Sequence, residues 1–587
     1  MKIKREAVIV FFSAIFLCVF INGSKIESFI FEKVVGVSVL DEENMIKLTA
    51  EKELKQGMVT LLINNADAAY DKTKNVVYIP QNIELNEYIG KLTTEDGGYK
   101  LYIKKDKLIK NKARAIESGY AFTLYAVGKE DYYKGELVFT GMPIMNIYED
   151  EEIAYNYDRK NRLIRTGYMV IDDPYRNSAT TLKSSCSFHV RGGSSYNYEK
   201  SNYKLELDDG KQSLLGLRKS KDYILNSLYD DAGLIHNKVC MNIWEKISEY
   251  NSVPNDEGIQ GEYLELFINN EYKGVYLLTE RIDKSTLSLG EKDKLYKCRA
   301  DRVPEEYNYT NEMTDEMYPI FVLKYPKEDV PENWVTIKQW VNYYLKDGID
   351  SYEEGKAFLN LENAIDYNIF NLLIYGVDNI RKNVYFIARY NEDGTYQIEK
   401  VPWDMNETLG NIWIDMSESN FTLYDAEGYK DVYTWTNDVN ALYYENPLKI
   451  SQKIYNRWNE LRQSGVISEK VIIEILKMEM SYLHETGAYE RNYEKWPHGI
   501  EYWDESYAYE YVKKRIPFLD EYFRQLCIDN STDLICDGVN YTDEFEAKYY
   551  WDTNYEELIP WMDYGRETLL NHYIYYGKPF GLKGRKE

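Results

Sequence analysis

Hydrophobic and polar residues alternate over short stretches in the first quarter of the chain, and turn-forming residues separate these stretches. Asn64-Asn65 and Asp96-Gly97-Gly98 are two such turn signals. Short strands at this spacing are typical of a small β-sandwich. The predicted strands are Val34–Leu40, Val59–Ile63, Val76–Ile79, Tyr99–Ile103, Ala121–Val127 and Glu136–Thr140. No cluster of reactive side chains accompanies them, so we assign residues 25–145 to a β-sandwich-like accessory domain.

The hydrophobic period becomes helical further along the chain. Apolar residues recur at helical spacing at Leu361, Ile365, Ile369, Leu372 and Leu373. This stripe predicts a core-facing helix that ends near Gly376. Val384–Tyr390 and Thr395–Val401 then have the composition of two strands, joined by a turn at Asn391–Gly394. From Leu448 onward the pattern is again helical.

The predicted hairpin brings polar residues together. Folding it about its turn places Asn383 opposite Pro402–Asp404, and Asp378 lies in the preceding loop. Asp378, Asn383 and Asp404 should therefore converge at the open end of the hairpin. Protein kinases use an Asp, an Asn five positions later and a second Asp beyond a hairpin to orient a hydroxyl and bind Mg²⁺. Solvated polar residues around a turn explain this segment equally well, so the spacing alone does not decide between them.

Length and charge narrow the class of protein. A chain of 587 residues is too long for one ordinary domain. Its net charge of −26 excludes a general nucleic-acid binder, which needs a basic surface. Basic residues followed by the apolar run Ala7–Ile21 predict an export signal or an uncleaved membrane anchor over residues 1–24. We therefore expect a secreted or cell-surface protein that meets a membrane only through this segment.

The sequence lacks the motifs of several other enzyme classes. The five histidines form no HxxxH or HExxH pattern, which disfavours a zinc hydrolase, and the chain has neither GxxxxGK[ST] nor GxSxG. The five cysteines after the N-terminal segment are widely spaced, which disfavours a disulfide scaffold. Cys527 and Cys536 are close enough in sequence to pair, and free thiols are expected for the others. A glycoside hydrolase with paired catalytic carboxylates is not excluded, because the chain contains many acidic residues.

Six blocks of sequence carry more information than any single motif. They are HVRGGSS at 189–195, KSNYKLEL at 200–207, LLGL at 214–217, YDDAGLIHNK at 229–238, NEYKGVYLLTE at 270–280 and VPWDMN at 401–406. In this order, over roughly residues 143–525, they resemble the CotH kinase family, the spore coat protein H-like atypical protein kinases. The resemblance implies an α+β fold in which residues 146–527 form an atypical kinase-like, two-lobed domain with a helical C-terminal part. A short, aromatic-rich surface or binding module over residues 537–587 would follow it.

The resemblance also implies roles for individual residues. Asp378 would be the catalytic base. The metal ligands would be Asp404, Asn383 and Asn406. The residues that bind the nucleotide would be Arg191, Lys204, Glu280 and Asn237.

Lys204 has a strand context of its own. Tyr203, Leu205 and Leu207 alternate with Lys204 and Glu206, which places the lysine on the face opposite the core-seeking residues. A lysine in this position is ordinarily an exposed strand residue, and only the sequence motif predicts that it binds a nucleotide. Glu280 could pair with it as a kinase helix glutamate pairs with its lysine, or could form a structural salt bridge.

Two positions depart from the family pattern. His236 stands where the family usually has Arg, which weakens a positive charge at neutral pH. Asn406 stands where Asp is common, so a metal ligand would lose its charge.

These inferences predict an exported phosphotransferase that uses ATP with Mg²⁺ or Mn²⁺. Its substrate would be Ser or Thr hydroxyls of an exported protein, with a sugar hydroxyl or self-phosphorylation left open. The alternative is a catalytically silent, kinase-like structural or adhesive protein of the cell surface. The oligomeric state is not indicated.

Overall fold

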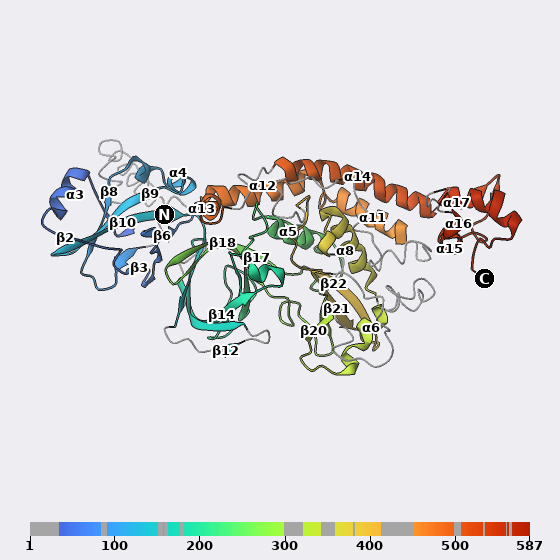
Figure 1. Cartoon of the computed structure of the whole chain (residues 1–587), viewed down its shortest axis with the longest axis horizontal. Coiled ribbons are helices and arrows are strands. Elements are labelled where there is room, and N and C mark those ends of the chain that lie inside the picture. The colour runs from blue at the N-terminus through green and yellow to red at the C-terminus, as the bar shows by residue number, and fades with distance from the viewer. Residues whose placement is uncertain are drawn as a thin grey trace, which may run out of the picture. The chain divides into compact units, whose positions relative to one another are not determined.

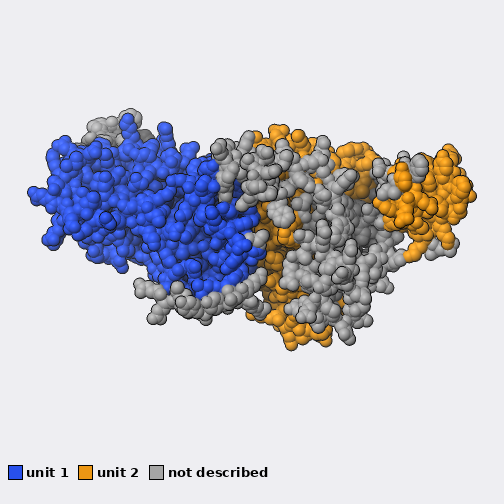
Figure 2. Space-filling model, viewed as in Figure 1, with its two compact units in different colours: residues 1–232, 260–281, 478–502 blue, residues 233–259, 282–477, 503–587 orange. Residues whose placement is uncertain are grey.

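The computed structural model describes residues 35–83, 91–150, 156–157, 162–175, 181–298, 321–341, 359–379, 382–411, 426, 450–497, 506–531, 534–558, 560, 562 and 566–586. The predicted export segment, residues 1–24, lies outside them, as do Val34 and Leu448. The chain divides into two compact units (Figure 2). Unit 1 contains residues 1–232, 260–281 and 478–502, and unit 2 contains residues 233–259, 282–477 and 503–587. Helices and strands occur in both (Figure 1), which confirms the α+β class.

Two sheets form the N-terminal part of unit 1. The larger has the order β1 (Ser38–Leu40), β8 (Lys100–Lys104), β9 (Ala121–Val127), β10 (Asp131–Thr140), β6 (Val76–Pro80) and β5 (Ala69–Asp71), with β2 (Glu53–Lys55) also on β10. The smaller has the order β4 (Ala66–Asp67), β3 (Leu61–Ile63) and β7 (Leu92–Thr94). Both contribute side chains to one hydrophobic core, as in a sandwich. The parallel pairs β1–β8, β2–β10 and β6–β10 were not predicted.

A closed β-barrel follows in unit 1. Its strands are β11 (Ile144–Glu149), β17 (Gly261–Ile268), β18 (Glu271–Glu280), β16 (Asp222–Asn226), β15 (Asn202–Leu207), β14 (Thr181–Arg191) and β13 (Leu163–Asp172), in this order. The ring closes because β13 also pairs with β11, and the short β12 (Asn156–Tyr157) adds to β13. Alternate residues face inward in such a barrel. Leu205 and Leu207 therefore lie in its core, whereas Lys204 and Glu206 lie on its outer surface.

The LLGL block has a structural role in this barrel. It lies in the connection from β15 to β16, and Leu214 and Leu217 are buried in the barrel core. Gly216 has a φ of 88°, a left-handed conformation that glycine adopts without steric cost. The block thus folds back into the barrel and contributes to its core.

Helix α13 (Ala488–Lys495) is tied to the barrel by a buried ion pair. Arg491 Nε and Nη2 donate to the two carboxylate oxygens of Glu265 over 2.8 and 2.9 Å. Arg491 Nη2 also donates to Thr140 Oγ1 over 2.6 Å, which adds the end of β10 to the same cluster. Apolar residues of the N-terminal sheet and of the barrel, including Tyr78 and Phe267, share a further small core.

Unit 2 is built around helix α8 (Leu361–Ile374). The predicted apolar stripe and the helix end before Gly376 are confirmed, but the helix is buried on all sides from Asn363 to Ile374. Trp244 of α5 (His236–Ser248) packs against Phe370 with ring centroids 5.1 Å apart. Arg457 of α11 (Ile450–Gln463) binds both carboxylate oxygens of Asp366, over 2.8 and 3.0 Å. Such full coverage explains why polar residues of α8 are also buried.

The remaining elements of unit 2 include one further sheet and the helical C-terminal part. The sheet has the order β20 (Phe321–Tyr325), β19 (Lys294–Cys298), β21 (Val384–Tyr390) and β22 (Tyr396–Pro402), and α6 (Val335–Val341) packs near β22. Helix α14 (Ser506–Ser531) is anchored by Arg515, whose Nε donates to Leu372 O over 2.8 Å. Helix α12 (Glu469–Glu485) precedes α13 in the chain.

The aromatic-rich C-terminal segment has a core of its own. It contains β23 (Ile535–Cys536), β24 (Val539–Asn540), α15 (Ala547–Thr553), α16 (Tyr555–Leu558), α17 (Arg566–His572), the π-helical turn η9 (Tyr573–Gly577) and η10 (Lys578–Phe580). Phe545, Tyr550 and Tyr573 lie at its centre. The five cysteines of the described residues are free thiols, so Cys527 and Cys536 are not paired. Within the described part of the chain, no helix is both long and apolar enough to cross a membrane.

The buried pair Glu265–Arg491 should stabilise unit 1. Replacing Glu265 by Ala leaves the Arg491 guanidinium buried without its carboxylate, so we expect a loss of about 3–5 kcal/mol in the free energy of unfolding. Hydrogen exchange of the β17 and β18 amides measures this loss. Glu43→Ala is the control, because Glu43 forms an ion pair on the surface. The Glu43 side chain is 79% exposed and that of its partner Lys47 is 67% exposed. The free energy of unfolding should therefore fall by less than about 1 kcal/mol in this variant. Equal protection in the two variants would contradict the expectation.

Candidate active site

The end of helix α8 directs the chain toward the predicted site. Tyr375 has a left-handed φ of 51°, and its amide donates to the carbonyls of Asn371 and Leu372, which ends the helix. After Gly376, the 3₁₀ turn η8 (Val377–Asn379) carries Asp378. The predicted loop position of Asp378 is therefore confirmed as a short turn directly beyond a buried helix.

The predicted hairpin is formed with the predicted register. β21 and β22 pair so that Val384 lies opposite Pro402, and Trp403 N donates to Asn383 O over 3.0 Å. Asn383 therefore lies at the open end, beside the segment that carries Asp404.

The three polar residues of the hypothesis converge there. Asn383 Nδ2 donates to Asp378 Oδ2 over 2.8 Å and lies 3.5 Å from Asp404 O. Asn383 and Asp404 have left-handed φ angles of 57° and 58°. This conformation costs about 1–2 kcal/mol for most residues and less for Asn and Asp. Its occurrence at two neighbouring residues of a predicted metal site agrees with the tendency of functional sites to hold unusual backbone conformations.

Asn237 and Asn406 lie close to the same segment. Asn237, at the start of α5, is buried, and its Oδ1 accepts a hydrogen bond from Met405 N over 2.7 Å. Asn406 is buried two residues beyond Asp404, and Asn411 Nδ2 donates to Asn406 O over 2.8 Å. Asn237, one of the residues predicted to bind nucleotide, thus contacts the metal-ligand segment within unit 2.

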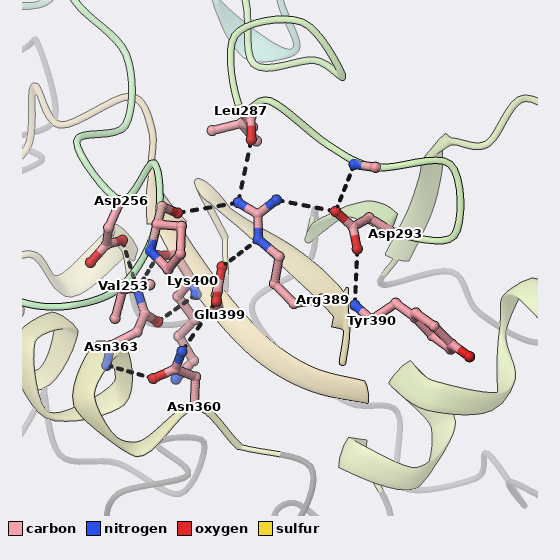
Figure 3. Close-up of polar contacts among 12 residues, drawn as sticks. Val253, Asp256, Leu287, Asp293, Asn360, Asn363, Arg389, Tyr390, Glu399 and Lys400 are labelled. Carbon is pink, nitrogen blue, oxygen red and sulfur yellow. Dashed lines mark hydrogen bonds and ion pairs between the residues drawn. The ribbon is translucent and has the colours of Figure 1, made fainter. Parts of the chain in front are cut away.

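The other end of the hairpin is fixed by charged groups (Figure 3). Arg389 of β21 donates to Glu399 over 3.0 Å, to Asp293 over 3.2 Å and to the carbonyl of Leu287 over 3.3 Å. Asp293 in turn accepts a hydrogen bond from Tyr390 N over 2.9 Å. Burial raises the pKa of Glu399, and the Arg389 guanidinium opposes this shift. The ion pairs hold both strands in place at the end that is remote from Asp404.

The remaining predicted residues, Arg191, Lys204 and Glu280, lie in unit 1. Lys204 Nζ is 2.7 Å from Glu206 Oε2 and 2.7 Å from Asp222 Oδ1. Hydrogen bonds from Lys204 and Lys221 lower the pKa of Glu206 to about 2. Lys204 is therefore held on the outer surface of the barrel by two carboxylates.

The expected pair between Lys204 and Glu280 is not formed. Glu280 is fully buried and accepts hydrogen bonds from Arg218 N, Arg218 Nη1 and Gln260 N over 2.8, 3.1 and 3.1 Å. The register explains this difference, because Lys204 lies opposite Ile224, which lies opposite Thr279, whereas Glu280 lies opposite Tyr223. Neighbouring positions of a strand face opposite sides, so Glu280 projects inward while Lys204 projects outward.

Arg191 is the last residue of β14, and the glycines of its block follow directly. Gly192 has a φ of 137°, and a Cβ there would lie 2.4 Å from Ser195 Oγ. The turn η2 (Ser194–Asn197) comes next. Gly192 is therefore required by the tight turn itself.

The donor set of the hairpin end suits a hard cation. Mg²⁺ prefers carboxylate and amide oxygens. Asp404 supplies a carboxylate. Asn406, two residues further on, and Asn383, which lies beside Asp404 across the hairpin, supply side-chain amides. No cluster of three or more His, Cys, Asp or Glu side chains suited to a metal occurs among the residues whose positions are described. The candidate site therefore depends on mixing carboxylate with amide oxygens.

Three residues at these sites were not found from the sequence. Lys382 Nζ lies 3.2 Å from Asp378 Oδ1, and its spacing of four from Asp378 was the available signal. Asn379 follows Asp378 and resembles an ordinary turn residue, so its burial was not visible. Asp222 reaches Lys204 from the neighbouring strand, which only the pairing of β15 with β16 reveals.

The family model described as CotH kinase protein matches residues 188–525, which is more than half of the 587 residues. No curated protein matches the sequence significantly. The matched range contains all eight residues that the sequence analysis assigned to the site.

Proposed function

Since the chain belongs to the CotH kinase family, we propose that it is an exported phosphotransferase that uses ATP with Mg²⁺ or Mn²⁺. We propose that it phosphorylates Ser or Thr hydroxyls of an exported or surface protein. In the two-lobed arrangement that we propose, Lys204 belongs to one lobe and Asp378 and Asp404 belong to the other. The observation that carries the proposal is the meeting of Asp378, Asn383 and Asp404 at the open end of the β21–β22 hairpin.

The proposed reaction follows from these positions. The oxygen of the acceptor hydroxyl attacks the γ-phosphorus of ATP, the bond from that phosphorus to its bridging oxygen breaks, and ADP leaves. Asp378 orients the hydroxyl and receives its proton, which then passes to solvent. Asp404, Asn383 and Asn406 would hold the metal ion, which neutralises charge on the phosphate oxygens when bound. Lys382 lies beside Asp378 and keeps its carboxylate in place.

A catalytically silent, kinase-like surface protein is the second candidate. Two departures from the family pattern favour it, namely His236 at the start of α5 and Asn406 beyond Asp404. Both changes remove charge from the neighbourhood of phosphate or metal. Asp378 and Asp404 are present, which supports the enzyme.

The purified chain should transfer label from ATP to itself or to a Ser-rich polypeptide when Mg²⁺ or Mn²⁺ is present. Chelation of the metal should abolish the transfer, because the phosphate charge is then no longer neutralised. Autoradiography after incubation with γ-labelled ATP measures this activity. Tight binding of ATP without transfer to any hydroxyl offered would support the silent protein instead.

The two aspartates should show different defects. Asp404→Ala removes a charged metal ligand, so the affinity for Mg²⁺ with a non-hydrolysable ATP analogue should fall at least about tenfold, or about 1.4 kcal/mol. Asp378→Asn should leave this affinity nearly unchanged and lower turnover about 10²–10⁴-fold, because it removes only the group that receives the proton. Calorimetric titration and initial rates separate the two effects. Equal losses of affinity would mean that the two roles are wrongly assigned.

The role of Lys204 can be tested against a neighbouring lysine. Lys204→Met should weaken binding of the ATP analogue by about tenfold, because it removes a positive charge predicted to face phosphate. Lys221→Met is the matched control, since Lys221 also binds Glu206 but is 51% exposed. Calorimetry on both variants gives the comparison. The assignment fails if the two substitutions change the affinity equally.

A further inference from the structure

One buried side chain contacts both strand ends that carry predicted metal ligands. Asn379 is the last residue of the turn η8, directly after Asp378, and it is 0% exposed. Its Nδ2 donates to Trp403 O over 2.8 Å and to Asn383 O over 3.2 Å. Trp403 immediately precedes Asp404, so a single amide group connects the turn of Asp378 with the peptide groups of both Asn383 and Asp404.

Asn379 is itself anchored to the centre of unit 2. Tyr367 of helix α8 donates its hydroxyl hydrogen to Asn379 O over 2.6 Å, and the Tyr367 ring is buried against Trp244. The position of Asn379 is therefore set by a helix that is buried on all sides. Any displacement of its amide would be transmitted to the two strand ends that it holds.

The amide of Asn379 is oriented for these two carbonyls at a cost. Both acceptors are carbonyl oxygens, so the nitrogen of the amide must face them. The amide oxygen is buried and has no hydrogen-bond donor among the described residues. A buried acceptor without a donor is unfavourable. The two N–H groups, which bind the two carbonyl oxygens, therefore explain an asparagine at this position better than the filling of space does.

Asp404 is held from its other side as well. Asn237 Oδ1 accepts the hydrogen bond from Met405 N over 2.7 Å, so the peptide groups before and after Asp404 both bind buried asparagines. Between them, Asp404 has its left-handed φ of 58°. This pair of contacts fixes the direction in which the Asp404 carboxylate leaves the backbone.

Asn363 provides a comparison within the same hairpin. It is also buried, and it binds the backbone of β22 at Lys400, whose N donates to Asn363 Oδ1 over 2.7 Å and whose O accepts from Asn363 Nδ2 over 3.1 Å (Figure 3). Lys400 lies three residues before Trp403, or about 10 Å along a strand. Asn363 thus supports the hairpin without touching a peptide group next to Asn383 or Asp404.

We propose that Asn379 is a positioning residue that holds Asn383 and Asp404 in the arrangement required to bind the metal ion. This inference rests on the proposed function, because it concerns the metal that serves phosphoryl transfer. Residues that orient metal ligands from behind change metal affinity by about 10–100-fold when they are replaced. Loss of Asn379 therefore affects the metal more than it affects the fold.

The test compares Asn379→Ala and Asn379→Leu with Asn363→Ala in the full chain. Asn379→Leu keeps the branched shape of the side chain, removes both N–H donors and adds no charge, so it replaces the alanine variant should that one fail to melt cooperatively. Free Mn²⁺ is measured by electron paramagnetic resonance in the presence of a non-hydrolysable ATP analogue, and thermal melting is recorded for each variant. We expect the Kd for Mn²⁺ to rise at least about tenfold in both Asn379 variants. In Asn363→Ala the Kd for Mn²⁺ should change less than about twofold, although the melting temperature should fall in this variant as it does in the Asn379 variants.

The outcomes separate the inference from the proposed function. If the unchanged chain binds Mn²⁺ with the analogue and Asn379→Ala binds it as Asn363→Ala does, Asn379 is structural and the inference is overturned. If the unchanged chain binds no Mn²⁺ with the analogue, the proposed function fails and the inference fails with it. A selective loss of Mn²⁺ affinity in the Asn379 variants at a melting temperature similar to that of Asn363→Ala supports both.

Discussion

The register between β21 and β22 is the constraint on which the candidate site depends. Side chains alternate along a strand, so a shift of one residue would send every side chain to the opposite face. Here two contacts across the hairpin agree with the register, and a third holds β22 from outside. Arg389 binds Glu399 across the strands and Trp403 N donates to Asn383 O, while Asn363 of α8 binds both backbone groups of Lys400. Only with this pairing does Asn383 Nδ2 come within 3.5 Å of Asp404 O.

Buried polar groups help to specify the arrangement of the hairpin, although their burial carries a desolvation penalty. Burial raises the pKa of Asp256, Asp366 and Glu399, and each carboxylate has an amide or guanidinium partner. Buried ion pairs often add little net stability compared with apolar packing. Their value lies in geometry, because a charged or amide group that must find its partner tolerates few alternative packings. The buried polar groups around α8 thus define the arrangement of the backbone as much as they stabilise the fold.

The sequence predicted those parts of this arrangement that depend on local patterns. The helical period of Leu361–Leu373 and the turn at Asn391–Gly394 were sufficient to place Asp378, Asn383 and Asp404 together. Closure of the barrel was not predictable in this way, since β11 must pair not only with the nearby β13 but also, in parallel, with β17 from a distant part of the chain. The position of Asn379 was also hidden, because a polar residue in a turn is usually solvated and its burial follows only from the packing of α8.

The position of Glu280 shows how a family pattern can mislead without geometry. In a kinase the partner of the lysine comes from a separate helix, and the match of motifs suggested the same pairing here. In this barrel the carboxylates near Lys204 come from its own sheet, Glu206 two positions along β15 and Asp222 on the adjacent strand β16. Glu280 projects to the inner face instead, where it binds the backbone of Arg218 and Gln260. The orientation of Lys204 is therefore established when the barrel folds, because every group that holds it belongs to the wall of the barrel.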